Sequence, residues 1–180
     1  MTQQDLLNRL ESDLRADLAD VRARFSDLNV NALTHRPDPN SWNILECLAH
    51  LNRIADDYTP AMQRAIHRAK ARRWTPSGSV RYTARGKRLL HRANPGNSKQ
   101  YKSRKRYNFT LHPLGQDIVK SFIIKNEQLL RMLQAASEVD LNRITVPKAN
   151  AWFGRYTLGN LLEYLVLHQR RHLRQAVSML

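Results

Sequence analysis

Apolar residues recur at spacings of three and four in four stretches of the chain, and this spacing is typical of an amphipathic α-helix. The stretches cover residues 3–28, 41–69, 114–137 and 158–179. In the first stretch the apolar positions are Leu7, Leu10, Leu14, Leu18, Val21, Phe25 and Leu28. We therefore predict four long helices, each with an apolar face that has to be buried against other helices.

The segments between these stretches lack a sustained period. Residues 29–40 contain two prolines, which restrict the preceding residues to extended conformations, so we predict a connecting loop and then a helix capped by Ser41. Residues 70–112 consist of turn-forming and basic sequences, in which only residues 85–92 favour a short helix. A connection of this length is unusual inside a compact domain and is more often functional or mobile than structural.

Four helices joined by one long and two shorter connections predict an all-α fold, a four-helix bundle with a long crossover between helices 2 and 3. No internal repeat or second domain boundary is visible in the 180 residues. We therefore predict a single domain over residues 1–180, with a basic irregular insertion at about 70–112. The alternative is a three-helix core whose first helix is swapped or docked on a partner chain.

Composition indicates the environment of the protein. No run of 18 or more apolar residues is present, and the first residues, Met1-Thr-Gln-Gln-Asp, do not have the composition of a signal peptide. We therefore expect a soluble, cytoplasmic protein with no membrane span. A single cysteine, Cys47, excludes an internal disulfide and a zinc site built from several cysteines.

The net charge of +15 comes from one segment. Residues 64–106 contain 15 of the 30 lysines and arginines, and no acidic residue occurs between Asp57 and Asp117. Aromatic residues are interleaved with these cations, so groups that hold phosphates and rings that stack on bases occur together. No recognised nucleic-acid-binding motif accompanies the charge, and a charged loop is often simply solvated. Weak binding of nucleic acid or of an anionic surface through residues 64–106, with a structural metal, is therefore the alternative function.

The fourth apolar stretch contains two histidines where leucines are expected. Leu158, Leu161, Leu165, His168 and His172 lie at spacings of three and four, so both imidazoles belong to the inward face of the helix. A pair of histidines four residues apart on a helix can bind one metal ion. Buried histidines that are hydrogen-bonded within a core have the same spacing. A third ligand on another helix would decide between these interpretations.

Two segments of the sequence resemble the signatures of the DinB-like superfamily. In Ser41-Trp-Asn-Ile-Leu-Glu-Cys-Leu-Ala-His50 of the second helix, Trp, Glu and His follow one another at intervals of four residues. In the fourth helix, His168-Gln-Arg-Arg-His172 is followed by Leu-Arg-Gln175. The resemblance covers essentially the whole chain. It implies a four-helix bundle, a homodimer and a metal ion bound by His50, His168 and His172.

The implied site has the composition of a catalytic metal centre. Three imidazoles leave at least one coordination position open, and we expect one divalent metal ion per chain, zinc first and nickel second. Such an ion lowers the pKa of a bound water or low-molecular-weight thiol, which then attacks an electrophilic small-molecule substrate. The family includes bacillithiol and mycothiol transferases and a maleylpyruvate isomerase. We therefore predict a metal-dependent enzyme, a hydrolase or thiol S-transferase, with a purely structural metal as the alternative.

Five further residues are candidates near this site. Glu46 lies one turn before the histidine of the second helix, so its carboxylate is a candidate for proton transfer or for orienting an imidazole. Glu163 has the same alternatives, or is an exposed helix residue, and Cys47 is either a fourth ligand or a small buried filler. Trp152 and Phe153 either line the mouth of the site or plug one end of the bundle. The remaining histidines match nothing in the pattern and are expected at the surface: His35, His67, His91 and His112.

Overall fold

The computed structural model describes residues 1–97, 99, 101–110, 112–149 and 153–180. Most of these residues are helical, which confirms the predicted all-α class. The helices are α1 Gln3–Phe25, α2 Val30–Thr34, α3 Ile44–Ala71, α4 Ala84–Ala93, the 3-10 helix η1 Lys105–Tyr107, α5 Asp117–Ala136 and α6 Leu158–Val177. Two short antiparallel strands complete the structure, β1 Thr145–Pro147 and β2 Arg155–Thr157. Among the described residues, no helix combines the length and the apolar content needed to cross a membrane.

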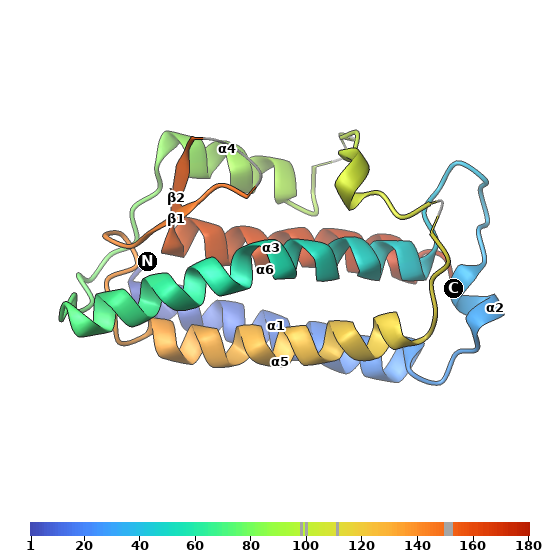
Figure 1. The fold of residues 1–180 in the computed structure, drawn as a ribbon, viewed down its shortest axis with the longest axis horizontal. Helices are drawn as coiled ribbons and strands as arrows, with labels where there is room; N and C mark the ends of the chain where they lie inside the picture. Colours follow the sequence, from blue (N-terminus) through green and yellow to red (C-terminus); the bar gives the residue numbers. More distant parts are fainter. Residues whose placement is uncertain (98, 100, 111, 150–152) are drawn as a thin grey trace.

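The long helices α1, α3, α5 and α6 lie side by side along the length of the molecule (Figure 1). α3 packs against both α5 and α6, and α1 packs against the same two helices. α3 and α5 run in the same direction, opposite to α1 and α6 (Figure 1). The chain between α3 and α5 therefore has to return along the whole molecule, which explains the long connection that the sequence predicts here.

Two apolar clusters form the core, and a polar layer separates them. On α6, Leu165 belongs to the first cluster and Leu173 to the second, so the two histidines of this helix occupy the interval between them. On α3 the change of cluster falls between Leu51 and Ile54, next to His50. Apolar packing on both sides therefore holds the histidine-bearing parts of α3 and α6 against each other.

Two helix starts differ from the prediction. The predicted loop 29–40 contains α2, which is capped by the side chain of Asn29. The N-cap of α3 is Asn43 and not Ser41. The Asn43 side chain accepts a hydrogen bond from the backbone N–H of Glu46, whose carboxylate accepts one from the backbone N–H of Asn43. Both differences arise because several neighbouring residues can cap a helix, and the sequence alone does not select among them.

α4 confirms the short helix predicted over residues 85–92, and it packs along α6. Asn160 of α6 is completely buried below it. The side chain of Asn160 accepts hydrogen bonds from the backbone N–H and the hydroxyl group of Thr83, and it donates one to the carbonyl group of Arg81. Gly86 lies so close to this amide that a Cβ atom there would be 2.0 Å from Asn160 Oδ1. Asn160 thus fixes the start of α4 on α6.

The chain after α4 is held by Arg171 of α6. Its guanidinium group donates hydrogen bonds to backbone carbonyl groups of this segment. The acceptors are Arg92, Asn94, Asn97 and Lys99. The crossover is therefore attached to α6 at two points, although little of it has regular structure.

Candidate metal centre

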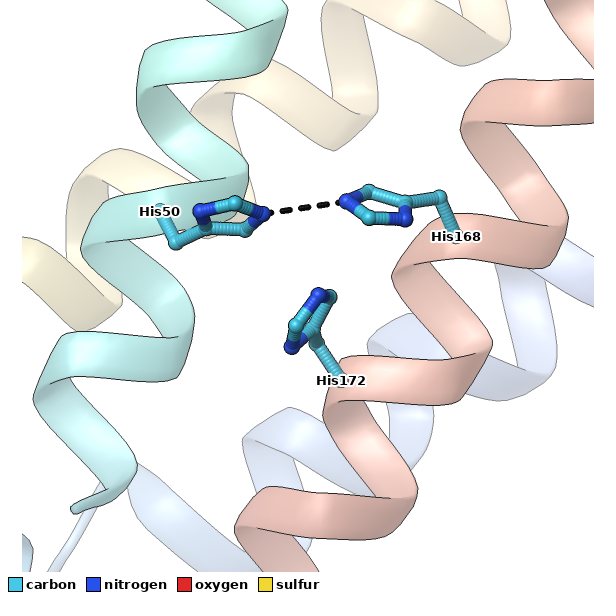
Figure 2. Close-up of side chains that lie close together, drawn as sticks. All are labelled: His50, His168 and His172. Atoms are coloured by element: carbon cyan, nitrogen blue, oxygen red, sulfur yellow. Dashed lines mark hydrogen bonds between the residues drawn. The ribbon is translucent and has the colours of Figure 1, made fainter. Parts of the chain in front are cut away.

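The fold brings three histidines from two helices together. His50 projects from α3, while His168 and His172 project from successive turns of α6 (Figure 2). One ring nitrogen from each residue lies within 4.8 Å of one from each of the others. Because residues four apart lie on one face of a helix, α6 presents both of its imidazoles to α3. His50 is therefore the third candidate ligand, on a second helix, that would complete a metal site with the histidine pair of α6.

Hydrogen bonds determine which nitrogens face the centre of the cluster. His50 Nδ1 lies 2.9 Å from the carbonyl oxygen of Tyr107, and because a carbonyl oxygen only accepts, Nδ1 carries the proton. The Nε2 atom of a neutral His50 is then unprotonated, and it lies 3.0 Å from His168 Nε2. His172 Nδ1 lies 3.2 Å from Gln175 Oε1 in the same arrangement. Two of the three imidazoles thus direct an unprotonated Nε2 inward, and the Nε2 of His50 accepts a hydrogen bond from His168 Nε2.

Aromatic rings hold the imidazoles in place. Trp42 stacks on His172 at 5.7 Å between ring centroids, and its ring is 5.0 Å from that of His50. Tyr164 stacks on His168 from the other side, at 5.2 Å. These rings restrict rotation of the imidazoles and keep water away from the cluster.

Burial keeps the cluster neutral. Removal from water lowers the pKa of His50, and it lowers the pKa of His168 well below the ordinary value, with a further contribution from the neighbouring histidines. Burial also lowers the pKa of His172 to about 3. At neutral pH all three imidazoles therefore have a lone pair available for a metal ion.

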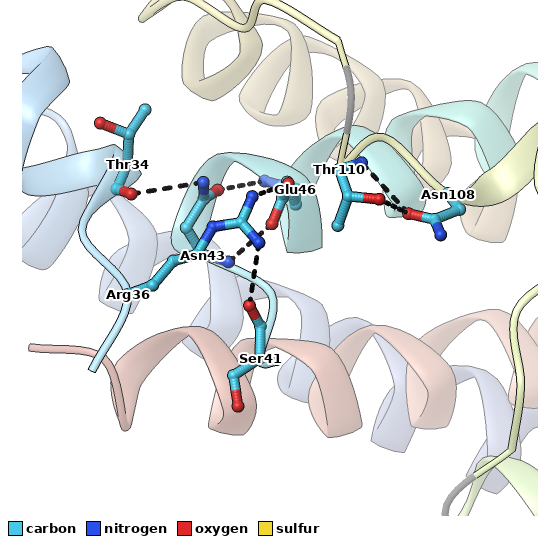
Figure 3. Close-up of polar contacts among 7 residues, drawn as sticks. All are labelled: Thr34, Arg36, Ser41, Asn43, Glu46, Asn108 and Thr110. Carbon is cyan, nitrogen blue, oxygen red and sulfur yellow. Dashed lines mark hydrogen bonds and ion pairs between the residues drawn. The ribbon is translucent and has the colours of Figure 1, made fainter. Parts of the chain in front are cut away.

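Glu46 belongs to a hydrogen-bonded network at the start of α3 (Figure 3). One carboxylate oxygen accepts from the backbone N–H of Asn43, and the other forms an ion pair with Arg36. Arg36 also donates to the carbonyl group of Ser41, and the network as a whole joins the loop before α3 to its first turn. Among the described residues, no hydrogen bond joins this carboxylate to a histidine. A catalytic role for Glu46 stays a prediction.

The other candidates are placed as follows. Glu163 is buried and not exposed, and its carboxylate forms an ion pair with Arg9 of α1. Cys47 is buried, and burial raises the pKa of its thiol to about 12, which agrees with the role of an apolar filler. Phe153 is 82% exposed, so it does not plug the end of the helices, and Trp152 lies outside the described residues. The four histidines expected at the surface are all exposed: His35, His67, His91 and His112.

Two contributors to the site were missed at the sequence level. Tyr164 could have been found, because it lies one turn before His168 on the same face of α6. Tyr107 could not, because its contribution is a backbone carbonyl group in an irregular segment, and every residue has one. The contact between Tyr107 and His50 depends on the path of the crossover over the cluster.

Comparison with known protein families identifies the superfamily of the chain. The sequence profile of the DinB superfamily matches residues 13–176, which include both histidine-bearing helices. The chain belongs to the DinB superfamily. The same comparisons found no match among curated proteins and none among solved structures. Membership confirms the resemblance seen in the sequence, and a DinB protein with this three-histidine cluster could hold a metal ion.

The donor set fits such an ion. Three neutral imidazole nitrogens from two rigid helices are a common ligand set for zinc, and the hydrogen bond that each of two rings makes through Nδ1 is the usual means of orienting a ligating histidine. Among the described residues, the group of potential ligands contains only these three histidines. Any further coordination position would therefore be left to water or substrate.

Proposed function

We propose that this member of the DinB superfamily is a metal-dependent enzyme with one divalent ion per chain, bound by His50, His168 and His172 between the two core clusters of a four-helix bundle with a long crossover. The observation that carries the proposal is the approach of three neutral ring nitrogens to within 4.8 Å of one another. Zinc is the first choice and nickel the second, because imidazole nitrogen suits both. An open coordination position is typical of catalytic sites and not of structural ones.

The chemistry follows from that open position. A divalent ion with three imidazole ligands lowers the pKa of a coordinated water or thiol toward neutrality. The protein's own groups prepare the site: the Tyr107 carbonyl group and Gln175 hold the tautomers of His50 and His172, and Trp42 limits access of bulk water. The reaction we propose is attack of water or a low-molecular-weight thiol on an electrophilic small molecule, as a hydrolase or a thiol S-transferase.

Glu46 acts on the proposed metal site indirectly, through the position of His50. Its carboxylate closes the N-terminal cap of α3 one turn before His50, so it sets where the helix begins and hence where the imidazole points. We place Glu46 as a positioning residue, and direct proton transfer by its carboxylate requires that it leave both of its present partners. Glu46→Gln keeps the acceptor for the Asn43 N–H, so it should retain metal and most activity, whereas Glu46→Ala should lose both in part.

Metal analysis tests the proposal. Protein purified without a nickel column should contain close to one ion per chain, and His168→Ala with His172→Ala should remove it. A matched control replaces two exposed histidines, His67→Ala with His91→Ala, and should keep the ion. Full occupancy in the first variant would disprove the assignment. Turnover is then measured with an electrophile such as chlorodinitrobenzene plus a thiol, and with a panel of esters and amides.

A further inference from the structure

The outward face of α4 is entirely basic. Its buried and half-buried positions, Gly86, Leu89, Leu90 and Ala93, turn toward α6 and the core. From the second residue of the helix onward, the exposed positions are Arg85, Lys87, Arg88, His91 and Arg92. Acidic residues and neutral amides are both missing from this described helix. The polar side of α4 therefore presents four positive charges and one imidazole.

Helix stability does not explain this choice of residues. Arg88 has a like charge three residues before it, at Arg85, and four residues after it, at Arg92, and such pairs destabilise a helix. The first turn contains a cation and no acidic residue, although a negative charge is favourable at a helix N-terminus. Glutamate at one of these positions would stabilise α4. The cations of the first two turns are thus unfavourable for the helix itself, whereas Arg92 in the last turn suits the helix dipole.

The cations of α4 also lack partners of opposite charge. On α1, by contrast, Arg15, Arg22 and Arg24 each form an ion pair with a carboxylate. Among the described residues, no carboxylate lies within ion-pair distance of any of the four cations of α4. This face therefore produces a positive potential that nothing nearby compensates.

An exposed aromatic ring stands at each end of this row of cations. Tyr101 is 40% exposed, and Arg92 and Lys99 lie 5.5 and 5.9 Å from its ring centre. At the start of the helix, Phe153 is 82% exposed in the connection between β1 and β2. The next residue, Gly154, lies against the helix, since a Cβ atom there would be 3.2 Å from Arg85 Nη1. Cations in a row and exposed rings beside them form the pattern by which proteins bind single strands.

We propose that the outward face of α4, with Tyr101 and Phe153, binds single-stranded nucleic acid. The cations contact phosphates, and the two rings stack on unpaired bases, which a duplex would not expose to them. A membrane surface fits less well, because in the part of the chain that the structure describes the large exposed apolar side chains near this face are these two separate rings. The face lies on the far side of the molecule from α5 (Figure 1), so α5 offers control positions.

The first experiment measures the affinity of the full chain for a fluorescein-labelled 30-nucleotide single strand of mixed sequence, by anisotropy, at several salt concentrations. Lys87→Gln with Arg88→Gln should weaken binding about 25-fold at 0.1 M salt and reduce the slope of log affinity against log salt by about 1.4, because each phosphate contact on a single strand contributes about 0.7. The control, Lys120→Gln with Arg131→Gln, removes two exposed charges of α5 that make no ion pair among the described residues, and should change little.

The second experiment tests the rings. Phe153→Ser should weaken binding about 5- to 150-fold, the range for loss of one stacked base, without a change of salt slope. Ile124→Ser is the matched control, because Ile124 is a 54% exposed apolar residue of α5. Thermal unfolding of each variant establishes that it is folded. Binding should survive His168→Ala with His172→Ala, since the face does not include the histidines.

Four results would overturn the proposal. The first is no binding at 50 mM salt, and the second is equal affinity of the α4 and α5 double variants. The third is binding to vesicles that contain phosphatidylserine without binding to the oligonucleotide. The fourth is equal affinity for a duplex of the same charge, which would exclude recognition of single strands.

Discussion

Basic side chains lie on both sides of α6: histidines on the side that faces α3, and arginines, a lysine and a histidine of α4 on the opposite side. The two groups differ in burial and in charge. On the inner side, His168 and His172 face α3 in a buried cluster where desolvation lowers their pKa values. On the outer side, α4 presents His91 and four cations to water. The comparison shows that burial decides what a basic side chain can do. A buried imidazole loses its charge and has a lone pair available for a metal ion, whereas an exposed guanidinium acts at a distance through its field.

The largest effect is expected on the inner side, from metal. Zinc added to chelator-treated protein should raise the free energy of unfolding by about 4 kcal/mol when its concentration is 1,000 times the dissociation constant, because the ion binds the folded state. Urea unfolding with and without zinc measures this difference. In His168→Ala with His172→Ala the difference should vanish. A gain that persisted there would mean that zinc binds elsewhere.

Acid should destabilise the metal-free protein through the same histidines. Their pKa values are lower in the folded state than in the unfolded chain, so the unfolded chain binds more protons as the pH falls below about 6.5. Their contribution is complete above that pH and is lost as the pH falls toward about 3, the value for His172. His172 alone should contribute about 1.4 kcal/mol per pH unit, or about 2 kcal/mol between pH 6.5 and 5, and the other two histidines act in the same direction.

Urea titrations at those two pH values check this pH dependence. His172→Gln, which keeps a polar side chain without the titration, should be less sensitive to acid than the unmodified protein. An unchanged pH slope in this variant would show that His172 is not kept neutral by the fold. His91→Gln on the outer side is the control for the replacement of a histidine outside the buried cluster.

The next largest effect on stability is expected where α4 packs on α6. Gly86→Ala should destabilise the protein by about 1–2 kcal/mol, because overpacking against the buried Asn160 amide outweighs the better helix propensity of alanine. Thermal unfolding measures the loss, and Asn160→Ala in the same chain should make Gly86→Ala nearly neutral. If Gly86→Ala stabilised the protein by itself, α4 would not be packed as closely as the structure has it.

The smallest effect concerns the outer face. Arg88→Glu should stabilise the protein by about 0.5–1 kcal/mol, because it converts two repulsive pairs, with Arg85 and Arg92, into attractive ones. The same substitution should reduce affinity for a single strand. A gain in stability together with a loss of binding would support the interpretation that the cations of α4 serve a ligand. Loss of stability would show instead that Arg88 has a structural role.

The long helices of the fold could be predicted from the sequence, whereas the short elements could not, for physical reasons. The long helices were found because three- and four-residue spacings persist over many turns, as in Leu7 to Leu28. β1 and β2 were missed because three-residue strands are too short to show a period. α2 was missed because a five-residue helix depends on one cap, Asn29, and not on a pattern.

The candidate site was predicted in part for similar reasons. The spacing of His168 and His172 was visible in the sequence, but the meeting with His50 was inferred only through the family resemblance. The Glu46 carboxylate shares a helix with His50, yet its contacts run to Asn43 and Arg36, which depends on the path of the loop before α3.

The sequence by itself determined the family, the helical class, the positions of the long helices and the concentration of positive charge, because each is a property of spacing or composition. Only the tertiary structure decided that His50 meets His168, that the Tyr107 carbonyl group sets its tautomer, and that α4 turns its cations away from α6. These features are contacts between residues far apart in the chain, which follow from the packing of whole helices and not from any local pattern. Burial then made the histidines neutral, and exposure left the arginines charged.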